Sequence, residues 1–92
     1  MIAEKVVIIK NKQGLHARPA ALFVQRANKF SSEITIVKGR QKINGKSIMG
    51  IMMLAAGAGS KVTVIANGDD ADLAIIELEK LLLADDMDEF VI

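Results

Sequence analysis

Apolar residues follow two different spacings along this chain, and the order of these spacings limits the folds available to it. Some short segments alternate apolar and polar residues, as half-buried strands do, and others repeat apolar residues at helical spacing. The predicted elements, in chain order, are strand 2–9, helix 17–28, strand 32–37, strand 40–43, helix 48–53, strand 61–66 and a last helix capped by Asp69 or Asp70. Because helices and strands do not alternate strictly, this βαββαβα order argues against a parallel doubly wound sheet. It predicts an α+β fold in which a four-stranded antiparallel sheet carries three helices on one face.

Two of the predicted helices have a clear stripe of residues that should face the core. In the first helix, this stripe is Ala20, Phe23, Val24 and Ala27. In the last helix, it is Ala71, Ala74, Ile75, Leu78, Leu81 and Leu82. Leu73, Ile76 and Leu83 fall outside that stripe, beside charged residues. They are either singly exposed or part of a self-association surface.

Composition narrows the possible function classes. Apolar residues make up 51% of the chain, which is typical of a globular protein rather than a disordered one. The chain has no cysteine and one histidine, so we expect no disulfide, no metal site and no cofactor. No segment approaches the roughly 18 apolar residues that cross a bilayer, and the N-terminal residues do not resemble a signal peptide. We therefore expect a cytoplasmic protein without membrane insertion, in which residues 1–92 form one domain and about 85–92 form an acidic tail.

Charge is divided unevenly along the chain. Residues 1–61 contain 11 lysines and arginines and two acidic residues. Residues 62–92 contain one lysine and nine acidic residues. The basic part is expected to steer encounters with acidic protein surfaces. Nucleic acid is the alternative partner, but the chain has no tryptophan or tyrosine and three phenylalanines, so it offers few residues for base stacking. Lys38, Arg40 and Lys42 are better explained as an exposed hairpin face, and no direct binding of nucleic acid is expected.

The stretch NKQGLHARPAA at 11–21 joins the first predicted strand to the first predicted helix. Gly14 fits the turn, and Pro19 fits the first helical turn, where a missing N–H costs nothing. His16 then lies at the helix entrance, beside unpaired backbone N–H groups and the positive end of the helix dipole, which together favour an anion. Arg18 in the first turn opposes the dipole unless an anion such as a phosphoryl group is present. The residues alone leave two interpretations open: a histidine that accepts phosphate, or a histidine that only caps the helix.

A second motif, NGKSIMG at 44–50, indicates a turn followed by a short helix. Ser47 is well placed as the N-cap of that helix, which is an ordinary role for serine. The helix is apolar nearly all round, so it is either buried or partly exposed as an adaptable, methionine-rich docking surface. The residues predicted to dock partners are Ile48, Met49, Ile51 and Met52.

Together, GLHARPA at 14–20 and NGKSIMG at 44–50 closely resemble two motifs of HPr, the histidine-containing phosphocarrier family of the bacterial phosphoenolpyruvate:sugar phosphotransferase system. The resemblance extends to about residue 83 and implies an open-faced β-sandwich with sheet order 1-4-2-3. It also implies that His16 accepts a phosphoryl group on Nδ1 from phosphorylated enzyme I and passes it to the IIA components of sugar permeases. Arg18 matches the family arginine that assists the transfer. Such a protein is a carrier with a phosphohistidine intermediate and has no independent turnover; the chain also lacks a recognisable nucleotide-binding loop.

Members of the family from Gram-positive bacteria have the NGKSIMG string around a regulatory serine, so the resemblance implies a second site at Ser47. In those members an ATP-dependent HPr kinase/phosphorylase modifies the serine, and the phosphoserine form binds a catabolite-repression transcription factor. Two features depart from the family pattern. The residues MLA at 53–55 stand where many members have Ser-Leu-Gly, and the tail DDMDEFVI at 85–92 extends beyond the usual end.

Two other functions are compatible with the sequence. The first is a regulatory paralogue of the family in a nitrogen-type or signalling phosphorelay, although the presence of His16 argues against a form that has lost carrier activity. The second is a small non-catalytic binding module in which His16 is only a helix cap. Transfer to sugar-specific IIA components separates the carrier from the paralogue. Labelling by enzyme I and phosphoenolpyruvate excludes the binding module.

Overall fold

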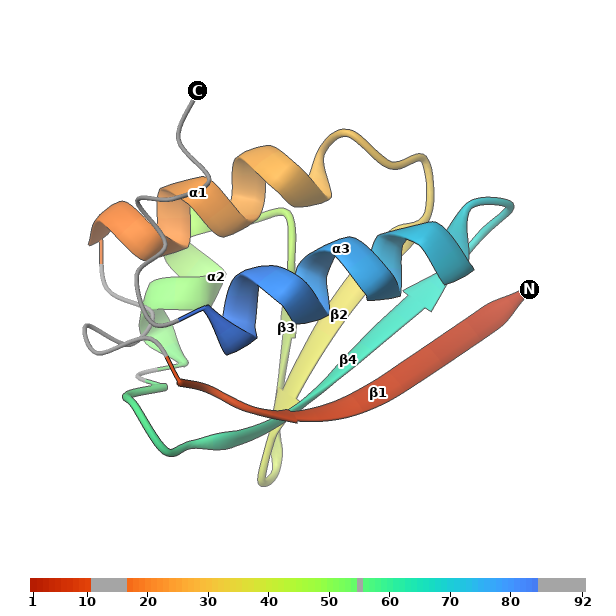
Figure 1. The fold of residues 1–92 in the computed structure, drawn as a ribbon. Helices are drawn as coiled ribbons and strands as arrows, with labels where there is room; N and C mark the ends of the chain where they lie inside the picture. Colours follow the sequence, from red (N-terminus) through yellow and green to blue (C-terminus); the bar gives the residue numbers. More distant parts are fainter. Residues whose placement is uncertain (11–16, 55, 85–92) are drawn as a thin grey trace.

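The computed structural model describes residues 1–10, 17–54 and 56–84. These residues form the predicted elements in the predicted order (Figure 1): β1 (Ile2–Ile8), α1 (Ala17–Ala27), β2 (Glu33–Lys38), β3 (Gln41–Asn44), α2 (Ile48–Met53), β4 (Lys61–Asn67) and α3 (Ala71–Leu83). The short helix α2 has the predicted bounds, and each other predicted boundary lies within one residue of the observed one. Among the helices of the described residues, none is both long and apolar enough to cross a membrane.

The strands form one antiparallel sheet in the order β1-β4-β2-β3. The last strand in the sequence, β4, therefore lies between β1 and β2, and β1 and β3 are the two edges of the sheet. Figure 1 shows the helices together on one side of the sheet, with α2 packed beside α1. The predicted open-faced α+β sandwich, including its sheet order, is confirmed.

The hairpin between β2 and β3 turns one residue later than predicted. Gly39 has a φ of 59°, and it forms the turn with Arg40, so Lys38 ends β2 instead of opening the turn. Glycine adopts this left-handed conformation at little cost because it has no Cβ. Both strands shift by one residue, but their alternation is unchanged, and Ile34 and Ile36 still face the core.

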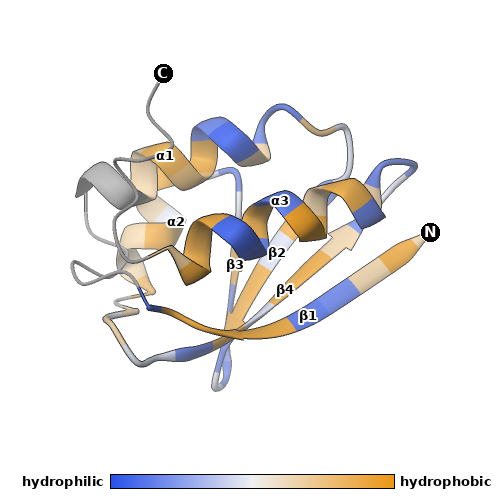
Figure 2. Ribbon diagram, in the orientation of Figure 1, coloured by the Kyte–Doolittle hydropathy of each residue, from blue (hydrophilic) through white to orange (hydrophobic). Residues whose placement is uncertain are grey.

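The hydrophobic core lies between the sheet and the helices. The buried strand residues are Val7, Ile34, Ile36, Val62, Val64 and Ala66. The predicted stripes of α1 and α3 are fully buried or nearly so, as expected, whereas Leu73, Ile76 and Leu83 are exposed. Val6 and Ile8 point to the opposite side of β1 and are also exposed. Figure 2 shows hydrophobic residues concentrated along α2, α3, β1 and β4, in contrast to the mostly polar β3.

Polar contacts fix the position of α3 relative to α1 and to the loop that follows α1. Arg26 of α1 donates through Nη1 to Oε2 of Glu77 in α3, at 3.4 Å. Asp70 is the N-cap residue of α3, but its side chain makes no hydrogen bond to the helix that it precedes. Its carboxylate instead accepts hydrogen bonds from Ser31 and Ser32. The prediction that an aspartate occupies the N-cap position is therefore confirmed. The expected hydrogen bond from the helix to its side chain is absent, because the carboxylate accepts hydrogen bonds from the two serines instead.

Candidate functional site

The first predicted site lies where the chain enters α1. His16 lies outside the described residues, so its surroundings remain a prediction. Arg18 is the second residue of α1 and belongs to its first turn. That turn contains no acidic residue. No carboxylate within it therefore opposes an anion at the positive end of the helix dipole.

The second predicted site, Ser47, is the N-cap of α2. Its backbone is extended, with φ −112° and ψ 118°, and its Oγ accepts a hydrogen bond from the amide N–H of Gly50 at 3.0 Å. The carbonyl oxygen of Ser47 also accepts from the amide of Ile51 at 3.0 Å. Both bonds are those of a standard N-cap, and the cap predicted from the sequence is confirmed. The side chain is half-buried.

The loop before Ser47 is held to the sheet by close contacts. The amide of Gly45 donates to the carbonyl oxygen of Ile34 at 2.7 Å. A Cβ at position 45 would lie 2.5 Å from Cγ2 of Ile34, so the approach of this backbone to β2 requires glycine. The ammonium of Lys46 donates to the carbonyl oxygen of Phe30, at 2.7 Å, just beyond α1. Ser47 is therefore positioned by both the sheet and the end of the α1 segment.

The exposed apolar residues of α2 form what we call the α2 surface: Ile48, Met49, Met52 and Met53. Successive residues of a helix differ by about 100° around its axis, so these four occupy an arc of roughly 140°. Met49 is the most exposed of them, at 74%. Met53 is not among the predicted docking residues, but it lies on the same arc of α2 and is 72% exposed.

Ile51 corrects the predicted docking set. Its side chain is 0% exposed and belongs to the core. The helical period explains the difference, because residue 51 lies outside the arc of the α2 surface and faces the sheet side of the helix. Because residues 48–53 are apolar nearly all round, their spacing alone did not separate the buried residue from its exposed neighbours.

The start of α1 and the helix α2 lie at the same end of the molecule. α1 and α2 pack against each other. Figure 1 shows the start of α1, where Arg18 falls, at the end where α2 lies. A partner that docks on the α2 surface therefore also approaches the beginning of α1.

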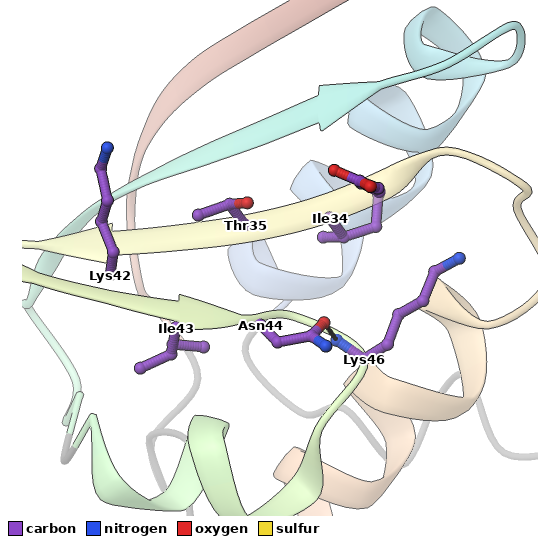
Figure 3. Close-up of a pocket in the computed structure, with 7 residues that line it drawn as sticks. Ile34, Thr35, Lys42, Ile43, Asn44 and Lys46 are labelled. Carbon is purple, nitrogen blue, oxygen red and sulfur yellow. Dashed lines mark hydrogen bonds between the residues drawn. The ribbon is translucent and has the colours of Figure 1, made fainter.

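A hollow of about 490 Å³ lies beside β2 and β3 (Figure 3). Its lining residues are Glu33, Ile34, Thr35, Lys42, Ile43, Asn44 and Lys46. Figure 3 shows Lys42 on β3 and Lys46 beyond the end of that strand, and their side chains extend in different directions, so they do not converge on one ligand. The Oδ1 atom of Asn44 accepts from the amide of Lys46 at 2.9 Å, which closes the turn before Ser47. Neither Ser47 nor the α2 surface lines this hollow, so it is separate from the predicted sites.

The chain is an open α+β sandwich with Arg18 in the first turn of α1 and with exposed apolar side chains on the neighbouring α2. The chain belongs to the HPr family of phosphocarriers, because residues 3–84 match the family described as "PTS HPr component phosphorylation site". This is a family of carriers rather than catalysts, and membership implies interaction with enzymes of the phosphotransferase system.

Relatives of two kinds are similar to this chain. The HPr-like protein Crh of Halalkalibacterium halodurans is 57% identical over 74 residues, which cover 80% of this chain and 88% of the relative. Phosphocarrier protein HPr of Treponema pallidum is 46% identical over 77 residues, which cover 84% of this chain and 88% of that relative. The crystal structure of phosphocarrier protein HPr from Bacillus anthracis has a TM-score of 0.86 at 48% identity, covering 88% of this chain and 96% of that one.

Proposed function

We propose that this chain is a cytoplasmic phosphocarrier that accepts a phosphoryl group on His16 from phosphorylated enzyme I and passes it to IIA components of sugar permeases. The observation that carries the proposal is the family match over residues 3–84, which includes GLHARPA at 14–20. Arg18 in the first turn of α1, with no acidic residue beside it in that turn, supports the same assignment.

The proposed reaction needs few groups from this chain. The neutral Nδ1 atom of His16 attacks phosphorus, a P–N bond forms, and the bond from phosphorus to the donor breaks with its electron pair leaving on the donor. Such in-line transfer depends mainly on positioning and on stabilising the charge of the phosphoryl oxygens. We assign this stabilisation to Arg18 and to the backbone N–H groups at the start of α1. One cation and a helix end hold the group weakly enough for the IIA component to remove it.

The α2 surface is the proposed docking site for enzyme I and the IIA components. It presents three exposed methionine side chains, which adapt to differently shaped partners at little cost. Residues 1–61, which contain the α2 surface and Arg18, carry most of the positive charge of the chain. This charge favours partners with acidic surfaces and accelerates their encounter at low salt.

We propose Ser47 as a regulatory phosphorylation site for an HPr kinase/phosphorylase. The support is the NGKSIMG string and the half-buried cap position, at which a phosphate lies next to the exposed α2 surface. Phosphorylation adds a charge of about −2, which the N-terminus of a helix tolerates. The same charge beside the α2 surface opposes the approach of an acidic partner such as enzyme I. We assign the phosphoserine form to binding a catabolite-repression transcription factor.

A second candidate function is favoured by the similarity to the HPr-like protein Crh. In that case the chain is a regulatory paralogue in a nitrogen-type or signalling phosphorelay. A paralogue that has lost the carrier step has no need of a histidine at position 16, so His16 favours the carrier. Assays of transfer from the phosphorylated chain to sugar-specific IIA components decide between the two functions.

The decisive experiment incubates the full chain with enzyme I and radiolabelled phosphoenolpyruvate. We expect an acid-labile, base-stable label, as phosphohistidine gives, which His16→Ala abolishes and Ser47→Ala retains. Absence of label on the wild-type chain under conditions in which a known HPr is labelled contradicts the proposal and favours the binding module.

A parallel experiment tests Ser47 with HPr kinase/phosphorylase and ATP. We expect an acid-stable label on the wild-type chain and on His16→Ala, and none on Ser47→Ala. Equal labelling of Ser47→Ala and the wild-type chain removes the regulatory assignment and leaves the carrier proposal intact.

A further inference from the structure

The end of α3 lies on the same side of the molecule as α2 (Figure 1). Hydrogen bonds fix this arrangement. The amide of Lys10 donates to the carbonyl oxygen of Leu82 at 3.1 Å, which bonds the end of α3 to the residues that follow β1. The carbonyl oxygen of the neighbouring Ile9 accepts from the amide of Gly59 at 2.7 Å, in the turn between α2 and β4. The acidic tail, residues 85–92, therefore begins close to the α2 surface.

The acidic tail is long enough to cross the α2 surface. It adds eight residues, DDMDEFVI, beyond Ala84. An extended chain spans about 3.3 Å per residue, so this segment reaches roughly 26 Å. The helix α2 has six residues, which give it a length of about 9 Å. A tail that starts at the end of α3 is therefore able to lie along the whole of α2.

The apolar residues of the tail match those of the α2 surface. Four of its eight residues are apolar, and three of these form the run Phe90–Ile92. The α2 surface offers the exposed side chains of Met49, Met52 and Met53. Methionine is flexible, and its sulfur makes favourable contacts with aromatic rings. Phe90, the one aromatic residue of the tail, is therefore a suitable occupant of this surface.

The charges of the tail are opposite to those of the part of the chain that contains α2. The other four tail residues are acidic, whereas residues 1–61 contain 11 lysines and arginines and two acidic residues. Lys10 is exposed, and its backbone is bonded to Leu82, three residues before Asp85. Opposite charges at this separation attract each other, most strongly at low salt. The tail therefore resembles the acidic, partly apolar surface that the α2 surface is proposed to bind.

We propose that the acidic tail binds the α2 surface of its own chain, with Phe90 against Met49 and Met52. The tether makes a weak contact sufficient. A short linker holds its end at an effective concentration of about 1 mM or more, so a contact with a Kd of that order between separate molecules is largely formed within one chain. The inference rests on the proposed function in one respect. The tail occupies the surface that we assign to enzyme I and the IIA components, and it therefore competes with them.

Two other apolar surfaces suit the tail less well. The helix α3 exposes Leu73 and Ile76, but residues 62–84 contain five acidic residues and one lysine, which disfavour an acidic segment. The exposed side of β1 lies on the side of the sheet away from the helices, so the tail has to pass around the edge of the sheet to reach it. Among the described residues, the α2 surface combines exposed apolar side chains, basic surroundings and a position within reach.

The first test places a spin label on the tail. The chain has no cysteine, so Glu89→Cys provides a single site for a nitroxide and keeps the apolar residues of the tail. In a chain labelled with ¹³C at the methionine methyl groups, we expect the nitroxide to broaden the NMR signals of Met49, Met52 and Met53, and reduction of the nitroxide to restore them. Phe90→Ser keeps the tether and the charges but should remove most of the broadening.

Two outcomes of this test overturn the proposal. Equal broadening with and without Phe90→Ser shows that the tail only passes near α2 and does not bind it. Broadening in a mixture of spin-labelled chains without ¹³C and ¹³C-labelled chains without the nitroxide shows that the tail binds a second copy instead of its own chain.

The second test compares the full chain with a chain that ends at residue 84, whose fold is checked by circular dichroism. The methyl signals of Met49 and Met52 should shift when the tail is removed, and the peptide DDMDEFVI, added at millimolar concentration, should shift them back. Signals of α2 that are identical in the two chains overturn the proposal. So do changes confined to α3 or to the exposed side of β1 in the amide spectrum.

Labelling by enzyme I measures the competition. The shorter chain should have a KM about threefold lower or less, because a partner binds only the fraction of molecules in which the α2 surface is uncovered. An unchanged KM, with the tail contact seen by NMR, contradicts the docking of enzyme I on the α2 surface and leaves the tail contact standing. Absence of the contact in the NMR spectra overturns the inference whatever the KM, so the two failures are distinguishable.

Discussion

Asp70 and Ser32, 38 residues apart in the sequence, are joined by two hydrogen bonds to a single carboxylate oxygen. Oδ1 of Asp70 accepts from the hydroxyl of Ser32 at 2.5 Å and from its amide at 3.0 Å. Oδ2 accepts from the amide of Ser31 at 2.9 Å. The carboxylate therefore connects the start of α3 to the segment between α1 and β2. The hydroxyl of Ser32, followed by the amide of Ser31, lowers the pKa of Asp70 from its usual 3.8 to about 2.

This lowered pKa predicts a loss of stability in acid. Above pH 4 the carboxylate is charged in both the folded and the unfolded chain, and its contribution to the free energy of unfolding is fully present. As the pH falls from about 4 to about 2, the unfolded chain takes up the proton first, and the contribution is lost. Asp70→Asn should flatten the pH dependence of urea unfolding in this window. Asp69→Asn makes the same charge change one residue away and should preserve the slope; equal slopes for Asp70→Asn and the wild-type chain would contradict the assignment.

The cap at Ser47 predicts a structural effect that is separate from regulation. Ser47→Ala removes the acceptor for the amide of Gly50 and should lower the free energy of unfolding by about 1 kcal/mol. Ser47→Asp keeps a side-chain oxygen at the cap and should recover most of that stability, while adding a negative charge beside the α2 surface. Chemical denaturation of the three proteins measures the effect. Equal stability of Ser47→Ala and the wild-type chain would show that the cap contributes nothing.

The separation of Ile51 from the α2 surface predicts opposite behaviour for neighbouring residues. Ile51→Ala leaves a cavity in the core and should cost about 2–5 kcal/mol of unfolding free energy. Met49→Ala, at an exposed position, should change stability by no more than about 0.5 kcal/mol but slow phosphoryl transfer from enzyme I. Thermal unfolding and single-turnover transfer, measured on both variants, distinguish the two roles. A large loss of stability in Met49→Ala would place that residue in the core instead.

The proposed role of Arg18 predicts a loss of transfer rate without a loss of fold. Arg18→Ala should slow phosphorylation by enzyme I by about 100-fold, because a charged donor to the phosphoryl oxygens is removed. The phosphorylation rate of Arg18→Lys should lie between those of the wild-type chain and Arg18→Ala, because lysine keeps the charge but not the bidentate hydrogen-bond geometry of arginine. Arg26→Ala is the matched control on the same helix: it breaks the contact with Glu77 and should leave the rate unchanged. Equal rates for Arg18→Ala and Arg26→Ala would remove Arg18 from the site.

Much of this fold was predictable because the apolar pattern has a single consistent interpretation in each segment. The buried stripe of α3, from Ala71 to Leu82, follows directly from helical spacing. The order of the strands did not follow from periodicity, because alternation in β1 or β4 says nothing about which strand lies beside which. The family resemblance supplied that order, and the structure confirmed it.

The candidate site was only partly predictable from the sequence. The cap at Ser47 followed from local rules, which depend on neighbours within a helical turn. The burial of Ile51 depends on which side of α2 faces the sheet, and an all-apolar helix carries no signal for that. The contacts of Asp70 with Ser31 and Ser32 also could not be predicted from the sequence, because only the complete fold brings these residues together.

The position of β1 at the edge of the sheet has a consequence for synthesis of the protein. Within the described sheet, β1 pairs with β4 alone. During synthesis, β1 therefore has no strand to pair with until β4, the last of the four strands, has been made. At 5–20 residues per second, the ribosome takes roughly 3–12 s to go from residue 8 to residue 67. Throughout that interval the emerging chain displays the run from Val6 to Ile9 with no strand to bond to. Chaperone contact during translation is therefore expected to concentrate on this N-terminal run and to end when β4 emerges.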